Sequence, residues 1–75
     1  MDPTAAEMRC VFVELQEACG FLRMDGDRDF AGSLLTYYQR HERWTARQSP
    51  HAKRLADKAM QSAPRGFHHH IIGAL

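Results

Sequence analysis

An apolar stripe near the start of the chain constrains its fold more than any other feature. The stripe repeats at alternating steps of three and four residues and consists of Met8, Val11, Leu15, Ala18 and Leu22. Residues at this spacing lie on one face of an α-helix, so the segment predicts an amphipathic helix. Thr4-Ala5-Ala6-Glu7 has the form of a capping box at its start, and Gly20 is its expected end.

Two more helices are expected further along the chain. The second should run from about Arg28 to Arg43, with Asp27 as its cap. Its predicted apolar stripe is Phe30, Leu34, Tyr37, His41 and Trp44, flanked by Ala31, Leu35 and Tyr38. The third should begin between residues 45 and 50, because Thr45-x-x-Gln48 and Ser49-Pro50 are competing start signals, and should continue to about Gln61.

These patterns predict an all-α fold, a small three-helix domain that resembles a helix-turn-helix. It should occupy residues 1–62, with an irregular C-terminal tail over residues 63–75 that begins near the helix breakers Pro64 and Gly66. A chain of 75 residues has a marginal core and often needs a disulfide, a metal or a partner. No signal peptide or membrane-length apolar run is visible, so the cytoplasm is the expected location.

The two cysteines and one valine suggest self-association instead of a disulfide. Cys10 and Cys19 on one helix would lie roughly 13 Å apart, and a disulfide needs Cα atoms within about 7 Å. Cys10 and Val13 fall off the main stripe of the first helix. Apolar residues on a second face favour a partner helix, so we expect a homodimer with Cys10 and Val13 at its interface.

Charge is distributed unevenly along the chain. Residues 1–29 carry seven acids and three bases, for a net −4, whereas residues 30–75 carry seven bases and two acids, for a net +5. Such asymmetry can serve an acidic partner, self-assembly of the acidic half against the basic half, or simply a solvated surface.

Two sequence runs raise the question of a metal site. Asp25-x-Asp27-x-Asp29 resembles the opening of a calcium loop, but Phe30 and Thr36 stand where an EF-hand needs glycine and glutamate. We therefore interpret it as a turn with capping aspartates. His68, His69 and His70 are adjacent, and neighbours in an extended chain face opposite sides. The alternatives are that these histidines are simply exposed, that they form a metal site, or that they are a remnant of an engineered tag. No cofactor or metal is predicted.

The middle of the chain carries a recognisable pattern. It comprises Phe30-Ala31-Gly32-Ser33-Leu34-Leu35, then Tyr38, Arg40, Trp44-Thr45-Ala46-Arg47-Gln48 and Leu55. This pattern resembles a helical segment of small phage and prophage proteins, over about a third of the chain. It departs from that segment at His41-Glu42-Arg43, where a loop glycine is expected, and at Pro50. The resemblance implies a mobile-element origin.

Aromatic and arginine residues gather at the predicted end of the second helix. The expected partner-binding set is Tyr38, Arg40, Arg43, Trp44 and Arg47, with Tyr37 assigned to the core. Such residues are enriched at protein interfaces, and the same set can stack on bases and neutralise phosphates. The alternative without a binding role is that the aromatic residues belong to the core and the arginines are solvated.

Two functions follow as hypotheses, and neither is enzymatic because no nucleophile motif, phosphate loop or HExxH is present. The first is a stoichiometric inhibitor or regulator that binds a host or viral protein, for example in an anti-defence role. The alternative is a small nucleic-acid-binding module that uses the basic third helix, with Arg47, Lys53, Arg54 and Lys58. A pI near 7.9 argues against the alternative.

Overall fold

The computed structural model describes residues 4–64, 66 and 67. Over these residues the fold is all-α, as predicted, with the helices α1 (Ala5–Ala18), α2 (Asp25–His41) and α3 (Gln48–Ser62) and the short 3-10 turn η1 (Cys19–Phe21). The three adjacent histidines and most of the expected tail lie outside the described residues, and the metal hypothesis for His68–His70 lies there with them. No described helix is both long and apolar enough to span a membrane.

The first helix begins with the expected capping box. The Thr4 hydroxyl accepts from the Glu7 backbone N–H at 3.1 Å, and the Glu7 carboxylate accepts from the Thr4 N–H at 3.3 Å. The helix ends at Ala18, and η1 carries the chain past Gly20. Leu15, Ala18 and Leu22 are buried, whereas Met8 and Val11 are partly buried and pack against the core from its edge.

The second helix begins earlier than its sequence predicts. It starts at Asp25 after Met24, whose side chain makes no cap hydrogen bond, so the assignment of Asp27 as the cap is wrong. Asp25 and Asp27 lie in the first turn, where the helix dipole favours negative charge. The helix ends at His41, two residues before the expected end, because Glu42 adopts the left-handed conformation with φ 55°.

The buried face of α2 is also rotated relative to the predicted stripe. Ala31 and Leu34 are buried, and Leu35 and Tyr38 pack partly against the core. Phe30, predicted to lie on the stripe, is 37% exposed, and His41 is exposed. The face toward the core is therefore centred about one residue later than the sequence pattern indicates.

The competing start signals of α3 are resolved in favour of Thr45. The Thr45 hydroxyl accepts from the Gln48 N–H at 3.2 Å, and the Gln48 side-chain oxygen accepts from the Thr45 N–H at 3.0 Å. The Ser49 N–H donates to the Thr45 carbonyl at 3.0 Å. Ser49 is consequently inside the first turn and not at a cap.

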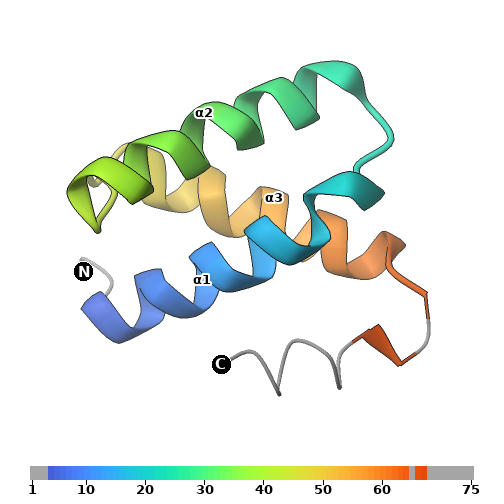
Figure 1. The fold of residues 1–75 in the computed structure, drawn as a ribbon, viewed down its shortest axis with the longest axis horizontal. Helices are drawn as coiled ribbons and strands as arrows, with labels where there is room; N and C mark the ends of the chain where they lie inside the picture. Colours follow the sequence, from blue (N-terminus) through green and yellow to red (C-terminus); the bar gives the residue numbers. More distant parts are fainter. Residues whose placement is uncertain (1–3, 65, 68–75) are drawn as a thin grey trace.

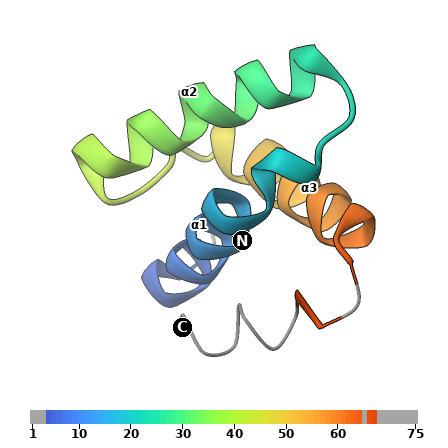
Figure 2. The same cartoon turned by 45° about the vertical axis from the view of Figure 1, so that its right-hand side comes forward.

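The three helices enclose one small core. The first and third helices share the largest contact, and α2 lies along one side of this pair (Figures 1 and 2). The largest fully buried side chains of the core come from one helix each and are Leu15, Leu34 and Leu55. Small alanines of α3, at positions 52, 56 and 59, let the helices approach closely. At the other end of α3, Phe67 packs edge-on against Phe21 with ring centroids 5.0 Å apart.

Candidate interaction surface

The turn between α2 and α3 is held by one buried side chain. Trp44 is only 3% exposed, and its indole Nε1–H donates to the Leu34 carbonyl at 2.7 Å. The Tyr38 ring stacks on Phe12 with centroids 4.3 Å apart and lies 4.9 Å from the Trp44 ring. This aromatic cluster joins α1, α2 and the turn, so the backbone of the turn is fixed from within.

The expected partner-binding set is therefore split by the structure. Trp44 belongs to the core, and its predicted place on the partner-binding surface is corrected, because a side chain this buried offers a partner almost no area. Tyr38 is partly buried and packs mainly against other rings of the chain. Tyr37, predicted to be core, is partly buried and has its ring 4.3 Å from that of His41.

The arginines of the set are all exposed. Arg40 lies in the last turn of α2, Arg43 lies in the turn that follows, and Arg47 directly precedes α3. None of the ion pairs found in the described part of the chain includes any of the three. We call Arg40, Arg43 and Arg47 the basic corner. Glu42 is the only acid within the stretch from residue 40 to residue 47.

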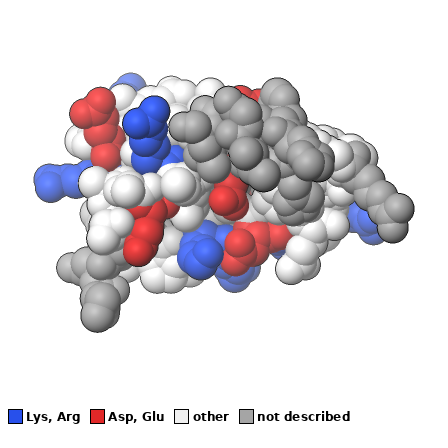
Figure 3. Space-filling view, turned by 90° about the horizontal axis from the view of Figure 1, so that it is seen from below, with Lys and Arg blue, Asp and Glu red and all other residues white. Residues whose placement is uncertain are grey.

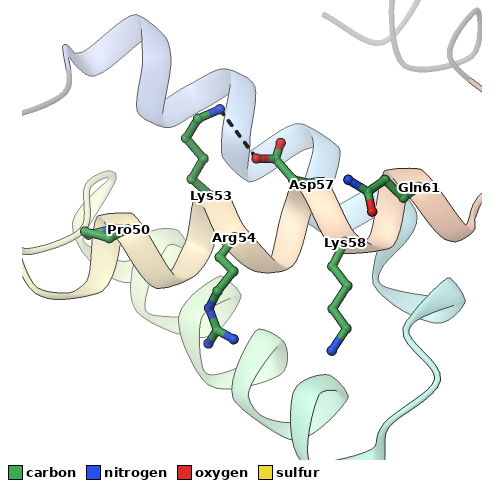
Figure 4. A pocket seen from close by; sticks show the side chains of 6 residues that line it. All are labelled: Pro50, Lys53, Arg54, Asp57, Lys58 and Gln61. Atoms are coloured by element: carbon green, nitrogen blue, oxygen red, sulfur yellow. Dashed lines mark ion pairs between the residues drawn. The ribbon is translucent and has the colours of Figure 1, made fainter.

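The basic residues of α3 are arranged differently from the basic corner. A shallow surface hollow over this helix is lined by Pro50, Lys53, Arg54, Asp57, Lys58 and Gln61 (Figure 4). Lys53 and Asp57 point toward α1 in that view, and Arg54 and Lys58 point to the opposite side. Lys53 lies 3.9 Å from Asp57, and Lys58 donates to Asp27 at 2.6 Å. Two of the cations that the nucleic-acid alternative assigns to phosphate binding therefore have an acidic neighbour within the chain.

The charge asymmetry of the sequence is partly neutralised by folding. The Lys58–Asp27 pair joins the basic half to the acidic half, and Arg28 pairs with Asp25 inside the acidic half. Figure 3 shows the molecule from below, and acidic and basic side chains are interspersed over the part of this face that is not grey. The basic corner, with three arginines and one acid between residues 40 and 47, is one of several short stretches of the chain in which one sign of charge prevails.

The structure places the aspartate run in α2, Cys10 in α1 and Cys19 in η1. Asp25, Asp27 and Asp29 lie in the opening turns of a helix, where side chains diverge, and not in a loop that could wrap a calcium ion. Within the described residues no cluster of three or more histidine, cysteine, aspartate or glutamate side chains could hold a metal. Both cysteines are free thiols; Cys10 is exposed and Cys19 is partly buried.

The predicted dimer residues lie on α1 but differ in exposure. Cys10 is exposed, and Val13 is partly buried. Val13 is not among the partly buried hydrophobic residues that pack against the core. The face of α1 that carries Val13 thus contributes an apolar side chain that the described core does not use.

A second feature of this region is absent from the sequence predictions. An apolar depression of about 610 Å³ lies between the N-terminal half of α1 and the start of α3, and we call it the α1–α3 depression. Its apolar lining includes Met8, Val11, Trp44, Ala46 and Pro50. The sequence explains each of these residues separately as part of the core, a turn or a cap, so no local signal marks the depression.

Comparison with known proteins identifies no relative. No protein-family model matches the chain, and neither does any curated protein or solved structure. The relation to phage and prophage proteins therefore stays a prediction from the motif in α2 and early α3.

Proposed function

We propose that this protein is a non-enzymatic interaction protein that acts stoichiometrically by covering a site on a host protein. The basic corner is the proposed binding surface. The proposal rests chiefly on three exposed arginines without ion-pair partners in the described part of the chain, grouped around a turn that Trp44 and the Thr45–Gln48 capping box hold in place. A preformed surface loses little entropy on binding, which favours its use as an interface.

The chemistry of the corner supports a protein partner over nucleic acid. Arginine is enriched at interface hot spots, where truncation can cost about 2 kcal/mol or more. A phosphate-binding helix would use the cations of α3, and one of them, Lys58, already donates to Asp27 at 2.6 Å. The motif resemblance to phage and prophage proteins is the reason for proposing a bacterial host and its cytoplasm as the setting.

A pull-down with paired arginine variants tests this proposal. The bait is the full chain or its Arg40→Ala/Arg47→Ala variant, and captured proteins are identified by mass spectrometry and rebuilt into a complex from purified components. The control, Arg9→Ala/Arg23→Ala, removes the same charge from exposed positions in the N-terminal part. We expect the corner variant to lose binding about tenfold or more and the control to retain it.

Salt dependence separates the two classes of partner. Binding to a protein through partly desolvated arginines should survive at high salt, whereas binding to DNA or RNA falls steeply with salt. Retardation of nucleic acid at low salt with a slope that the corner variant reduces would replace the protein-partner proposal by the nucleic-acid one. Equal protein binding by the corner variant and the control would overturn it.

We further propose that the protein self-associates through the Val13 face of α1. Its support is that Val13 does not pack against the described core. A chain this short has a marginal core, so an apolar side chain left outside that core favours contact with a partner. Val13→Glu should shift sedimentation toward monomer at high micromolar concentration. Gln16→Glu, an exposed position on the same helix, is the matched charge control. A monomeric wild-type chain under those conditions would refute the dimer.

A further inference from the structure

The α1–α3 depression is an apolar hollow of the size that other chains use to hold a ligand. Its volume of about 610 Å³ lies within the roughly 300–1,000 Å³ typical of ligand sites. Met8 and Val11 contribute apolar lining from α1, and Ala46 and Pro50 contribute it from the turn and the start of α3. Apolar side chains that cover such a surface displace water from it, and this favours an occupied depression over an empty one.

The charged residues that line the depression are Glu7, Glu14 and Lys53. The Lys53 ammonium lies 3.9 Å from the Asp57 carboxylate, so this cation already has an acidic neighbour on its own helix. Glu14 is half-buried and takes part in none of the ion pairs found among the described residues. The depression therefore favours an occupant that brings apolar side chains with hydrogen-bond donors or positive charge, and it disfavours an occupant that brings carboxylates.

The chain itself carries a segment of this chemistry directly after Phe67. Residues 68–75 contain no acid and have the sequence His-His-His-Ile-Ile-Gly-Ala-Leu. Histidine side chains donate N–H hydrogen bonds to carboxylates, and these bonds are strongest when the imidazole is protonated. The isoleucines at positions 71 and 72 supply adjacent apolar side chains. The segment thus matches the depression in its apolar character and in the charge that its rim favours.

The path of the chain brings this segment within reach of the depression. Phe67, the last described residue, packs edge-on against Phe21, just beyond the end of α1, with ring centroids 5.0 Å apart. An α-helix rises about 1.5 Å per residue, so Val11 lies roughly 15 Å back along α1 from Phe21. Four extended residues span up to roughly 13–14 Å, and eight span up to roughly 26–29 Å. Ile71 and Ile72 can therefore arrive at the α1 wall of the depression.

The covalent connection gives this segment an advantage over any free ligand. A segment that is joined to its site through a few residues acts at an effective concentration of about millimolar. It also avoids the loss of translational freedom that a separate molecule pays on binding. A chain of 75 residues has a marginal core, and coverage of the apolar surface between α1 and α3 would enlarge that core.

We propose that the segment 68–75 of the same chain occupies the α1–α3 depression, with Ile71 and Ile72 against its apolar lining and the histidines beside Glu14. The basic corner stays available to a partner, because none of its three arginines lines the depression. The inference therefore goes beyond the proposed function and does not depend on it. A second copy of the chain and an unrelated basic peptide are the competing occupants.

A disulfide trap measures the occupancy in the full chain. Cys10 is exposed and lines the depression, and Ala74→Cys places a second thiol in the segment. A Cys19→Ala background removes the other cysteine. A disulfide needs Cα atoms within about 7 Å, so its formation reports close approach. The matched control also carries Ile71→Ser/Ile72→Ser, and it has the same length and the same two thiols.

The disulfide should form about tenfold faster in the chain with two isoleucines than in the control with two serines. Serine gives up the apolar contact but keeps the connection to Phe67, so the comparison separates docking from tethering alone. Oxidation is followed at low protein concentration by intact-mass spectrometry and non-reducing gels. Equal rates in the two chains overturn the inference. A disulfide that forms mainly between two chains assigns the depression to a second copy and also overturns it.

Filling the depression tests the location of the segment. Ala46 is exposed and lines the depression, so Ala46→Trp should fill it and slow disulfide formation about tenfold. Gln61→Trp adds the same bulk at an exposed position of α3 outside the depression and should leave the rate unchanged. Circular dichroism checks that both variants are folded.

A charge reversal covers the case in which Ala46→Trp does not fold. Glu14→Lys replaces the carboxylate proposed to meet the histidines and should slow disulfide formation about threefold or more. Asp29→Lys makes the same change at an exposed position of α2 and should leave the rate unchanged. If neither Glu14→Lys nor a folded Ala46→Trp slows the reaction, the segment lies elsewhere and the inference is wrong.

The disulfide trap needs no host protein, so its result is separate from that of the pull-down. Loss of partner binding in Arg40→Ala/Arg47→Ala, together with equal rates in the isoleucine and serine chains, would leave the basic corner standing and remove this inference. A trap that closes as expected in a chain without a host partner would keep this inference and remove the proposed function.

Discussion

The indole N–H of Trp44 donates a hydrogen bond to the backbone carbonyl of Leu34, at 2.7 Å and across ten residues of sequence. The contact ties the turn after α2 back onto the middle of the helix that precedes it. It explains how a turn that contains Glu42 and two arginines can be held in one conformation.

Replacing Trp44 by phenylalanine should lower stability by about 2 kcal/mol. The variant loses one buried hydrogen bond, worth about 1 kcal/mol net, and leaves part of the indole volume empty. The Leu34 carbonyl keeps its place in the helix, so the fold should survive. Because Trp44 is the only tryptophan, thermal unfolding of the variant is followed by circular dichroism. An unchanged midpoint would mean that the indole contact contributes nothing.

Leu34→Ala should destabilise the protein more than Phe30→Ala. Leu34 is 1% exposed, and truncating a buried leucine costs about 2–5 kcal/mol. Phe30 is 37% exposed and should cost less, although its ring contacts that of His51. The comparison separates the observed face of α2 from the stripe predicted by its sequence. A larger loss for Phe30→Ala in urea unfolding would favour the predicted stripe.

Ser49→Ala should raise stability by about 1 kcal/mol. The buried hydroxyl of Ser49 has no partner in the described structure, and an unsatisfied buried group costs about 1–3 kcal/mol. Ser33→Ala is the control, because Ser33 is also helical but exposed and donates to the Asp29 carbonyl. Ser33→Ala gives up an exposed hydrogen bond and relieves no buried hydroxyl, so it should gain less in melting temperature than Ser49→Ala. A loss of stability in Ser49→Ala alone would show that the hydroxyl is satisfied.

Glu42→Gly should raise stability by about 1 kcal/mol. Glu42 ends α2 in the left-handed conformation, which is strained for a residue with a Cβ and is adopted freely by glycine. Its carboxylate also lies at the negative end of the α2 dipole. Glu42→Ala removes the charge but keeps the strain, so it should gain less. If the two variants melt at the same temperature, the backbone conformation carries no measurable cost.

The local signals in the sequence determined where α1 begins, and they narrowed the start of α3 to two competing signals between which the structure decided. The capping boxes at Thr4–Glu7 and Thr45–Gln48 both form, because each needs only residues three apart. The stripe from Met8 to Leu22 likewise gives the inward face of α1, since Leu15, Ala18 and Leu22 are buried. These features depend on neighbours along one helix, and periodicity and spacing describe them well.

Other features were decided only when the helices packed together. The stacking of Tyr38 on Phe12 and the burial of Ala31 turn α2 away from its apparent stripe, because the partner helices fix which face is covered. The sequence placed Trp44 both on the apolar stripe and in the partner-binding set, and packing decided for the core, where its indole N–H reaches the Leu34 carbonyl. Lys58 meets Asp27 from 31 residues away, and the α1–α3 depression joins α1 to the start of α3. Contacts between residues so far apart in the chain leave no periodic signal in the sequence, so only the tertiary structure could place them.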